Sequence, residues 1–417
     1  TAAPAAQPTA AQVAPAAKAK VSEVVIGALY PLTGPAAPVG VYIKNALQTA
    51  TDIANNRFED LPWAWAKTEG LPGLGGAKVR FVLADHQGTP EKGLSEAERL
   101  ITQEKVHVLG GAFQSAVTAT ASQAAERAKI PYLTPESSSP TLHTRGFQWF
   151  FRTSPHDGHF TQGMFEFMED FKKKNNVQLK TLGLTYEDTL FGEDSGRTQK
   201  ELAAKFGYEI VLDLKYRSRS TSLTTEIQQL KAANPDVWMP TSYQTDAILF
   251  TKTAKELDYN PKMIIAQDSG HIDPSFVEAV SKEAEGLISR APFVLDLADR
   301  KPLVKRINDL YRERSGGVDL FDGSARGFTG YMTLIDAINR AGSVEPEAIR
   351  KALLETNIPA EQIIMPWKGV KFESNGQNEA VSVLMMQLRG GTFSTVWPFD
   401  LAAKETLYPI PPWSERP

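Results

Sequence analysis

The sequence predicts an α/β protein with two Rossmann-like lobes built on open parallel sheets. Short β-branched apolar runs alternate with segments of helical periodicity, which is typical of parallel strands joined by helices. The alternation occurs in two successive series, and a chain of 417 residues is long enough for two or three domains. Apolar residues make up 42% and charged residues 23%, so the chain can form a sizeable core. None of its apolar runs approaches the roughly 18 residues that a membrane span needs.

The first series starts with the run VVIGALY, which is short, β-branched and followed by the turn-rich PLTGP, as expected for a buried strand. Apolar residues then recur at helical spacing from Val41 to Ala54. Strands separated by helices of this length form right-handed parallel units whose helices cover both faces of the sheet. The expected strands are 24–30, 79–85, 106–111 and 130–135, and the expected helices are 41–54, 89–101 and 118–129.

The second series repeats this alternation and ends in a segment of a different kind. From 369 to 399, runs of strand character follow one another with no helix between them, and we expect them to return to the earlier sheets. Before that segment, the expected strands are 179–186, 208–216, 236–240, 262–268 and 287–294, and the expected helices are 160–174, 195–206, 224–233, 246–257, 302–314, 323–341 and 345–355.

Two segments fall outside the alternation. Residues 1–20 contain ten Ala, three Pro and no aromatic residue, which predicts a flexible tether that cannot bury enough surface to order itself. Such a tether suits a secreted protein whose signal peptide has been removed, with a disordered cytosolic extension as the alternative.

The connection from Arg57 to Ala77 carries Trp63, Trp65 and several glycines. It is long for an α/β unit, so we expect either a loop near a binding cleft or a packed surface flap.

The sequence lacks the residues that several classes of function require. Lys and Arg number 45 against 49 Asp and Glu, and a net charge of −4 gives no reason to expect nucleic-acid binding. The chain has no cysteine, which excludes disulfides, thiol catalysis and cysteine-ligated metals. The motifs of serine hydrolases, zinc proteases and dinucleotide enzymes are missing, and Glu136 with His271 is the only loose candidate for a catalytic pair. His156 and His159 could bind a metal, but the proline and glycine of PHDGH favour a polar crossover. We expect no enzyme activity, no metal and no cofactor.

The ends of the predicted strands collect the residues of a small-molecule pocket. In open α/β sheets, ligands bind beyond the carboxyl ends of the strands. The residues there are aromatic walls, small hydroxyls and an acid, a composition typical of such a pocket. Ser115 and Ser137–Ser139 precede predicted helices, so their hydroxyls and N–H groups would face an anion such as a carboxylate, although each serine alone could be an ordinary N-cap. The set is Tyr30, Phe113, Gln114, Ser115, Glu136, Ser137–Ser139, Tyr186, Phe191, Tyr243 and Asp268.

Several longer motifs resemble the periplasmic leucine/isoleucine/valine-binding protein family. They occur in the family's order over nearly the whole chain, from about Val24 to Pro412. They are VVIGALYPLTGP with VGVYIKNALQTATDIAN, LADHQGTPEKGLSEAERLI, VLGGAFQSAVTATAS, KIPYLTPESSSPTL, GFQWFFRTSPHD, DTLFGEDSG and VKFESNGQN. The resemblance implies a type I periplasmic solute-binding protein of an ABC importer, whose two lobes are joined by three crossovers and close on a ligand.

The resemblance also implies roles for individual residues. Ser115 matches the family serine that binds the ligand carboxylate through its hydroxyl and backbone N–H, and Ser138 matches a hydroxyl residue that assists it. Glu136 falls where the family offers a backbone carbonyl to the ligand ammonium. Tyr243 and Asp268 match the aromatic and the acid that close on the amine, and Phe191 falls at a wall aromatic. Val39 stands where amino-acid binders often carry an aromatic residue, and Glu136 replaces a small one.

The lobes, ligand and partners follow as expectations from the same resemblance. We expect crossovers near 153–157, 290–295 and 366–372. They divide the chain into a tether (1–21), an N-terminal lobe (22–153 with 294–367) and a C-terminal lobe (154–293 with 368–417). The expected ligand is an amino acid or related small carboxylate, and the alternatives are an aromatic or other amine-free carboxylate and a ligand sensor on the same fold. The expected partners of this periplasmic monomer are the membrane permease and ATPase subunits of an ABC importer.

Overall fold

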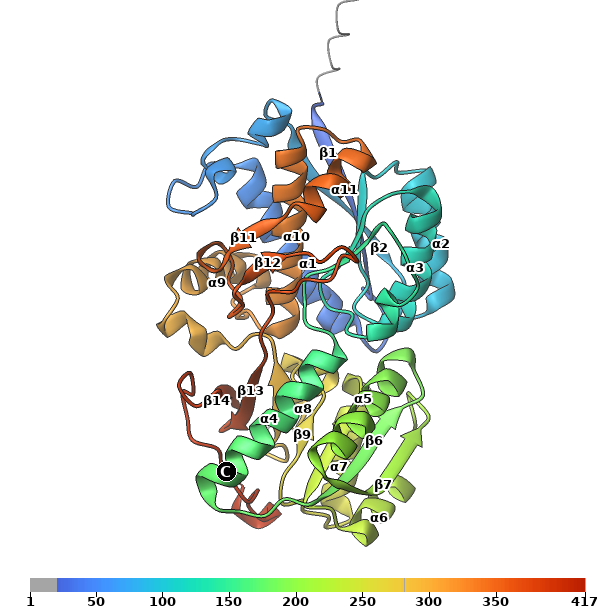
Figure 1. Ribbon diagram of the computed structural model, residues 1–417, viewed down its shortest axis with the longest axis vertical. Helices are drawn as coiled ribbons and strands as arrows, with labels where there is room; N and C mark the ends of the chain where they lie inside the picture. The colour runs from blue at the N-terminus through green and yellow to red at the C-terminus, as the bar shows by residue number, and fades with distance from the viewer. Residues whose placement is uncertain (1–20, 281, 417) are drawn as a thin grey trace, which may run out of the picture.

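Two α/β lobes lie one above the other along the long axis of the computed structural model, which describes residues 21–280 and 282–416 (Figure 1). The expected tether over 1–21 lies outside the described residues except for Val21. Within those residues, no helix has both the length and the apolar character to cross a membrane.

The first lobe is built on a parallel five-stranded sheet in the order β2-β1-β3-β4-β5. Alternate residues of β1 enter two different cores: Val24, Ile26 and Ala28 face one helical layer, and Val25 and Leu29 face the other. Both faces of the sheet are therefore covered, as predicted. The strands are β1 (Glu23–Tyr30), β2 (Lys78–Asp85), β3 (Val108–Gly111), β4 (Tyr132–Thr134) and β5 (Phe150–Arg152), of which β5 was not predicted. The helices are α1 (Ala37–Asn55), α2 (Pro90–Thr102), α3 (Ser115–Ala128), α9 (Pro302–Ser315), α10 (Asp322–Ala341) and α11 (Pro346–Leu354).

The second lobe has the expected parallel strands, to which two antiparallel strands are added at one edge. One parallel sheet has the order β7-β6-β8, and a second has the order β14-β13-β10-β9, in which β13 runs antiparallel to both β10 and β14. A parallel bridge between Trp238 and Ile264 connects the two sheets, and the Gln267 N–H donates to the Pro240 carbonyl at 2.9 Å. The strands are β6 (Thr181–Glu187), β7 (Glu209–Tyr216), β8 (Val237–Thr241), β9 (Ile265–Ala266), β10 (Ile288–Ala291), β13 (Leu384–Arg389) and β14 (Thr392–Trp397). The helices are α4 (Asp157–Asn175), α5 (Leu190–Phe206), α6 (Thr224–Ala233), α7 (Gln244–Glu256) and α8 (Pro274–Val280).

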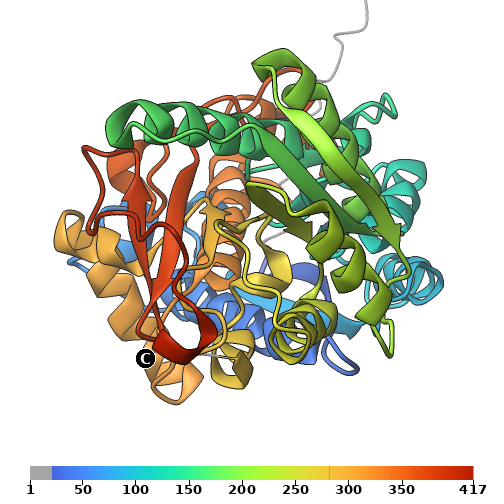
Figure 2. The same cartoon turned by 90° about the horizontal axis from the view of Figure 1, so that it is seen from below.

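The last strands return to an earlier sheet, as the sequence predicts, through a tight hairpin. Only Gly390 and Gly391 separate β13 from β14, and both have positive φ (58° and 78°), which a two-residue hairpin of the favoured hand requires. Figure 2 shows this hairpin in red next to α4. The antiparallel pairing makes the second lobe a mixed sheet, because a two-residue turn cannot return a strand parallel to its neighbour.

The segment 369–378 lies with the first lobe, although we expected it in the C-terminal lobe. Its strand β12 (Gly369–Lys371) pairs with β11 (Asn357–Pro359), which follows α11. Gln377 bridges to Arg152 of β5, and the Asn378 side-chain amide donates to the Thr153 carbonyl at 2.9 Å. We therefore propose that the third crossover lies after Asn378, beside the first one.

The connection from Arg57 to Ala77 is a packed flap. Trp63 and Trp65 are buried and stack with ring centroids 5.9 Å apart, and Trp63 Nε1 donates to the Gln362 carbonyl at 3.0 Å. The Trp63 ring also packs against Phe328 of α10. This segment completes the core of the first lobe and lines neither of the hollows between the lobes that are described below.

Candidate functional site

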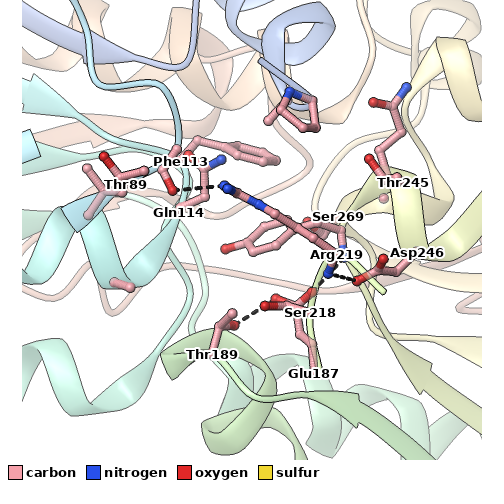
Figure 3. A pocket seen from close by; sticks show the side chains of 18 of the residues that line it. Thr89, Phe113, Gln114, Glu187, Thr189, Ser218, Arg219, Thr245, Asp246 and Ser269 are labelled. Atoms are coloured by element: carbon pink, nitrogen blue, oxygen red, sulfur yellow. Dashed lines mark hydrogen bonds between the residues drawn. The ribbon is translucent and has the colours of Figure 1, made fainter. Parts of the chain in front are cut away.

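Two hollows lie between the lobes, and we call them the outer chamber and the inner cavity. The outer chamber has a volume of about 450 Å³ and is shown in Figure 3. The inner cavity, of about 10 Å³, has room for about one water molecule. Three residues line both hollows: Phe113, Tyr243 and Ser269. The inner cavity is lined by these three and by Ser115, Glu136, Ser138, Phe191, Asp268, Arg290 and Arg326.

Of the twelve residues predicted for the site, the structure brings seven together in the inner cavity, while Ser137, Ser139 and Tyr186 line neither hollow. The inner cavity contains Phe113, Ser115, Glu136, Ser138, Phe191, Tyr243 and Asp268. Gln114 lines the outer chamber instead. Tyr30 lines neither hollow, because its hydroxyl turns toward the Glu136 carboxyl at 3.1 Å and its ring packs against Tyr331.

An aromatic cluster separates the two hollows. Phe113 comes from the first lobe, at a positive φ of 73°, while Tyr243 and Phe191 come from the second lobe. The Tyr243 ring centroid lies 5.9 Å from that of Phe113 and 5.3 Å from that of Phe191. Gly270 packs directly on the turn that holds Tyr243, since a Cβ there would lie 2.2 Å from the Tyr243 carbonyl carbon. The cluster therefore joins the two lobes, and the backbone that carries Tyr243 is closely packed.

The serines lie on the first lobe at the start of α3 and in the loop after β4. The Ser139 N–H donates to Ser115 Oγ at 3.3 Å, so the two segments are hydrogen-bonded to each other. The guanidinium of Arg152, fully buried, donates to the carbonyls of Ser137 (3.1 Å) and Ser139 (2.7 Å). Arg152 therefore positions the serine loop from the first crossover, a role that sequence analysis did not find.

Asp268 has different partners from those we expected. We predicted that its carboxylate would pair with a ligand ammonium, but it accepts hydrogen bonds from Arg290 and, at 3.4 Å, from Arg326. All three side chains are buried. The Arg290 guanidinium also stacks over the Phe160 ring at 3.4 Å. Asp268 is thus already neutralised by protein cations before any ligand is considered.

The charges around Asp268 form one buried network. Arg326 pairs with Asp322 as well as Asp268 and donates to the Glu136 carbonyl at 2.8 Å. Arg290 lies 3.8 Å from Asp157 as well as pairing with Asp268. Two guanidinium groups therefore face three aspartates, so the network has no uncompensated positive charge to offer an incoming anion. The carboxylate seat must come from the serines and their N–H groups, which are neutral donors.

Sequence analysis missed Arg290 and Arg326, although both left a signal. Arg290 interrupts the apolar run LISRAPFV, and Arg326 lies within a stretch of α10 in which every residue from Asp322 to Ile335 is buried. Arginine is almost never fully buried unless it is paired, so a charged residue at a core position marks a buried ion pair. The identity of the partners could not be read from these positions alone.

The lobes also contact each other through three polar pairs. Arg326 of the first lobe pairs with Asp268 of the second, and the Ser139 hydroxyl donates to Asp194 of α5. At the mouth of the outer chamber, Arg219 extends from the second lobe and donates to the Gly88 carbonyl of the first at 3.1 Å (Figure 3). The described arrangement is therefore one in which the two lobes are closed on each other.

A histidine at the first crossover caps a helix. The His156 side chain accepts from the N–H groups of Gly158 (3.0 Å) and His159 (3.4 Å), and so caps α4. Over residues 21–280 and 282–416, no group of three or more His, Asp or Glu side chains is arranged to hold a metal ion.

The stability of the protein should decline as the pH rises from about 6.5 to 8. Burial raises the pKa of Glu136 and Glu187 to about 8, so the folded protein keeps protons there that the unfolded chain has lost. Their contribution to the free energy of unfolding falls as the pH rises from the ordinary glutamate pKa of about 4.5 to about 8. Burial lowers the pKa of His86 and His271 to about 4, so their contribution rises between about pH 4 and 6.5 and opposes that of the carboxyls over this range. Burial also lowers the pKa of three further histidines, which are His143, His156 and His159.

Urea unfolding at pH 6.5 and 8 tests this expectation. The free energy of unfolding should be lower at pH 8 than at pH 6.5. Glu136→Gln should flatten the decline above pH 6.5, because the substituted amide has no proton to lose. A stability that keeps rising to pH 8 would show that the two buried carboxyls are ionised in the folded protein.

The chain is similar to proteins of known family over nearly its whole length. The family described as periplasmic binding protein matches residues 23–392. Leu/Ile/Val-binding protein homolog 7 of Brucella suis biovar 1 is 27% identical over 397 residues, which cover 93% of this chain and 94% of that protein.

Solved structures share the fold. A leucine-binding protein from Thermotoga maritima superposes with a TM-score of 0.76 at 22% identity, covering 89% of this chain and 97% of its own. A solute-binding protein from Rhodopseudomonas palustris, solved in complex with benzoate, has a TM-score of 0.75 at 17% identity, with 90% and 95% coverage. These similarities confirm the predicted arrangement of two α/β lobes.

Proposed function

Because the chain belongs to the periplasmic binding protein family, we propose that it is the solute-binding component of an ABC importer and captures a small carboxylate between its lobes. It would work in the periplasm as a monomer and deliver its ligand to a membrane permease and its ATPase. It would carry out no chemical reaction. The lobes would open at the crossovers and close on the ligand, which stabilises the closed state by its higher affinity for it.

One observation carries this proposal: hydroxyl groups and aromatic walls from both lobes converge on one cavity. Ser115 and Ser138 come from the first lobe, and Tyr243 and Phe191 come from the second. A ligand held by both groups touches the two lobes at once, and it can make those contacts only when the lobes are closed. Serine hydroxyls with the N–H groups at the start of α3 supply the donors that a carboxylate needs.

An amine-free carboxylate is a second candidate, and the pairing of Asp268 favours it. The ammonium of an amino acid must be paired when it leaves water. Asp268 was the expected partner, and both Arg290 and Arg326 already occupy it. A ligand without an α-amine would leave that network undisturbed. The Rhodopseudomonas neighbour that was solved with benzoate is an example of this fold with an amine-free acid.

Mass spectrometry of the denatured protein would identify any copurifying ligand, and calorimetry with Ser115→Ala would then test its seat. We expect the affinity for that carboxylate to fall by about 10- to 100-fold, the loss of one hydrogen bond to a charged group. Ser95→Ala, an exposed serine on α2, is the matched control and should leave the affinity unchanged. An unchanged affinity in Ser115→Ala would remove the serine seat from the proposal.

A further inference from the structure

We propose that the outer chamber receives a basic, N–H-bearing end of the ligand, so that the solute is an elongated carboxylate with a cationic group far from its carboxylate. This inference rests on the proposed function, since it takes the carboxylate to be held by the serines of the inner cavity.

The relative size of the two hollows requires the ligand to extend outward. The inner cavity of about 10 Å³ cannot hold a whole organic acid, whereas the outer chamber of about 450 Å³ falls within the usual range of small-molecule sites. Phe113 and Tyr243 line both hollows, so a ligand that reaches Ser115 passes this aromatic cluster and continues into the outer chamber.

Two buried acceptors in the outer chamber have no partner in the structure. They are Oδ1 of Asp246 and Oε1 of Gln114, and their residues are only 2% and 6% exposed. Asp246 lies in the first turn of α7 in the second lobe, and Gln114 lies directly before α3 in the first lobe. The other oxygen of Asp246 is held by the backbone N–H of Arg219 at 2.8 Å, which fixes the carboxyl in place (Figure 3). Buried acceptors without donors are costly, so a ligand that brings N–H groups would satisfy both.

The charges that line the outer chamber point to the same class of ligand. Five carboxyl residues line it: Glu91, Glu187, Asp188, Asp246 and Asp273. Among its described lining residues, Arg219 is the only arginine or lysine; its residue is exposed and its guanidinium reaches over the mouth to the Gly88 carbonyl. Glu187 keeps its proton at neutral pH, and the other four carboxyl groups still outnumber the single arginine, which favours a cation over a second carboxylate in this chamber. An ammonium or guanidinium in the outer chamber would also not compete with Arg290 and Arg326 for the Asp268 carboxylate.

Calorimetry with matched probes tests the inference on the full chain after any copurified ligand has been removed. L-arginine and L-citrulline have nearly the same shape, but only the first carries a distal charge. L-leucine and L-glutamate supply an apolar and an anionic distal end. We expect L-arginine to bind at least tenfold more tightly than each of the other three.

Two variants locate the distal seat. Asp246→Asn should weaken L-arginine at least tenfold and change L-leucine less than twofold, and Gln114→Ala tests the facing lobe should Asp246→Asn fail to fold. Asp309→Asn, an exposed aspartate on α9, is the control. If L-leucine, L-citrulline or L-glutamate binds more tightly than L-arginine, and Ser115→Ala weakens that binding, the inference is overturned and the proposed function still stands. If none of the four amino acids binds, 4-guanidinobutanoate, which has the distal cation but no α-amine, decides. Its binding supports the inference with an amine-free ligand, and its failure to bind overturns the inference together with the proposed carboxylate seat.

Discussion

Replacing Asp268 with asparagine is expected to lower the free energy of unfolding by about 3–5 kcal/mol. Removing one member of a buried ion pair leaves the opposite charge without compensation, and the cost of such a change is typically in this range. Here Asp268 lies between the guanidinium groups of Arg290 and Arg326, and all three side chains are buried. The variant would leave both arginines with less compensating charge and would remove the ion pair between the lobes.

Urea unfolding of Asp268→Asn beside Asp309→Asn measures the effect. The control removes a carboxylate whose side chain is 49% exposed and pairs with Lys305 one helical turn away, so its loss should cost less than about 1 kcal/mol. If Asp268→Asn proved as harmless as the control, the buried network would not be the structural element described here, and Asp268 would be available for a ligand.

Replacing Tyr243 with alanine is expected to weaken ligand binding by about 100-fold. Buried aromatic anchors at the centre of a binding site typically contribute 2 kcal/mol or more, and each 1.4 kcal/mol is about tenfold. The Tyr243 ring lines both hollows and contacts Phe113 across the lobes. Its removal therefore takes away contacts to the ligand and a contact that exists only between closed lobes.

Two further variants separate binding from general destabilisation. Tyr243→Phe keeps the ring and should lose less than about tenfold in affinity, the effect of one hydroxyl. Tyr259→Ala removes a buried tyrosine that belongs to the core of the second lobe and lines neither hollow. It should lower stability while the affinity for the copurified ligand is retained. An equal loss of affinity in Tyr243→Ala and Tyr259→Ala would mean that destabilisation alone weakens binding.

The parts of the fold that follow from local pattern were predictable from the sequence. β1 was predicted from a short β-branched apolar run, and α3 was predicted as a helix over 118–129, although it begins three residues earlier, at Ser115. The mixed sheet of the second lobe and the place of residues 369–378 were not, because they depend on pairings between distant segments. Gln377 bridges to Arg152, which is 225 residues away in sequence.

The same limit applies to the candidate site. Serines and aromatics at strand ends could be collected from the sequence, and they share one cavity. The role expected for Asp268 was not supported, because its partners Arg290 and Arg326 are 22 and 58 residues away. Nothing in the local sequence AQDSGH indicates that two arginines fold onto this carboxylate. The charged partners of a buried side chain are often distant in sequence, so they could be identified only from the structure.

Small-angle X-ray scattering of the protein with and without its ligand tests most directly the claim that the lobes capture a solute by closing. The comparison needs protein freed of copurified ligand by unfolding and refolding, and then saturated with the carboxylate identified by mass spectrometry. The radius of gyration should be larger without ligand, because the contacts between Asp268 and Arg326 and between Gly88 and Arg219 must open to admit it. It should decrease on saturation to the value calculated for the closed structure. The same radius of gyration in both states would contradict the account.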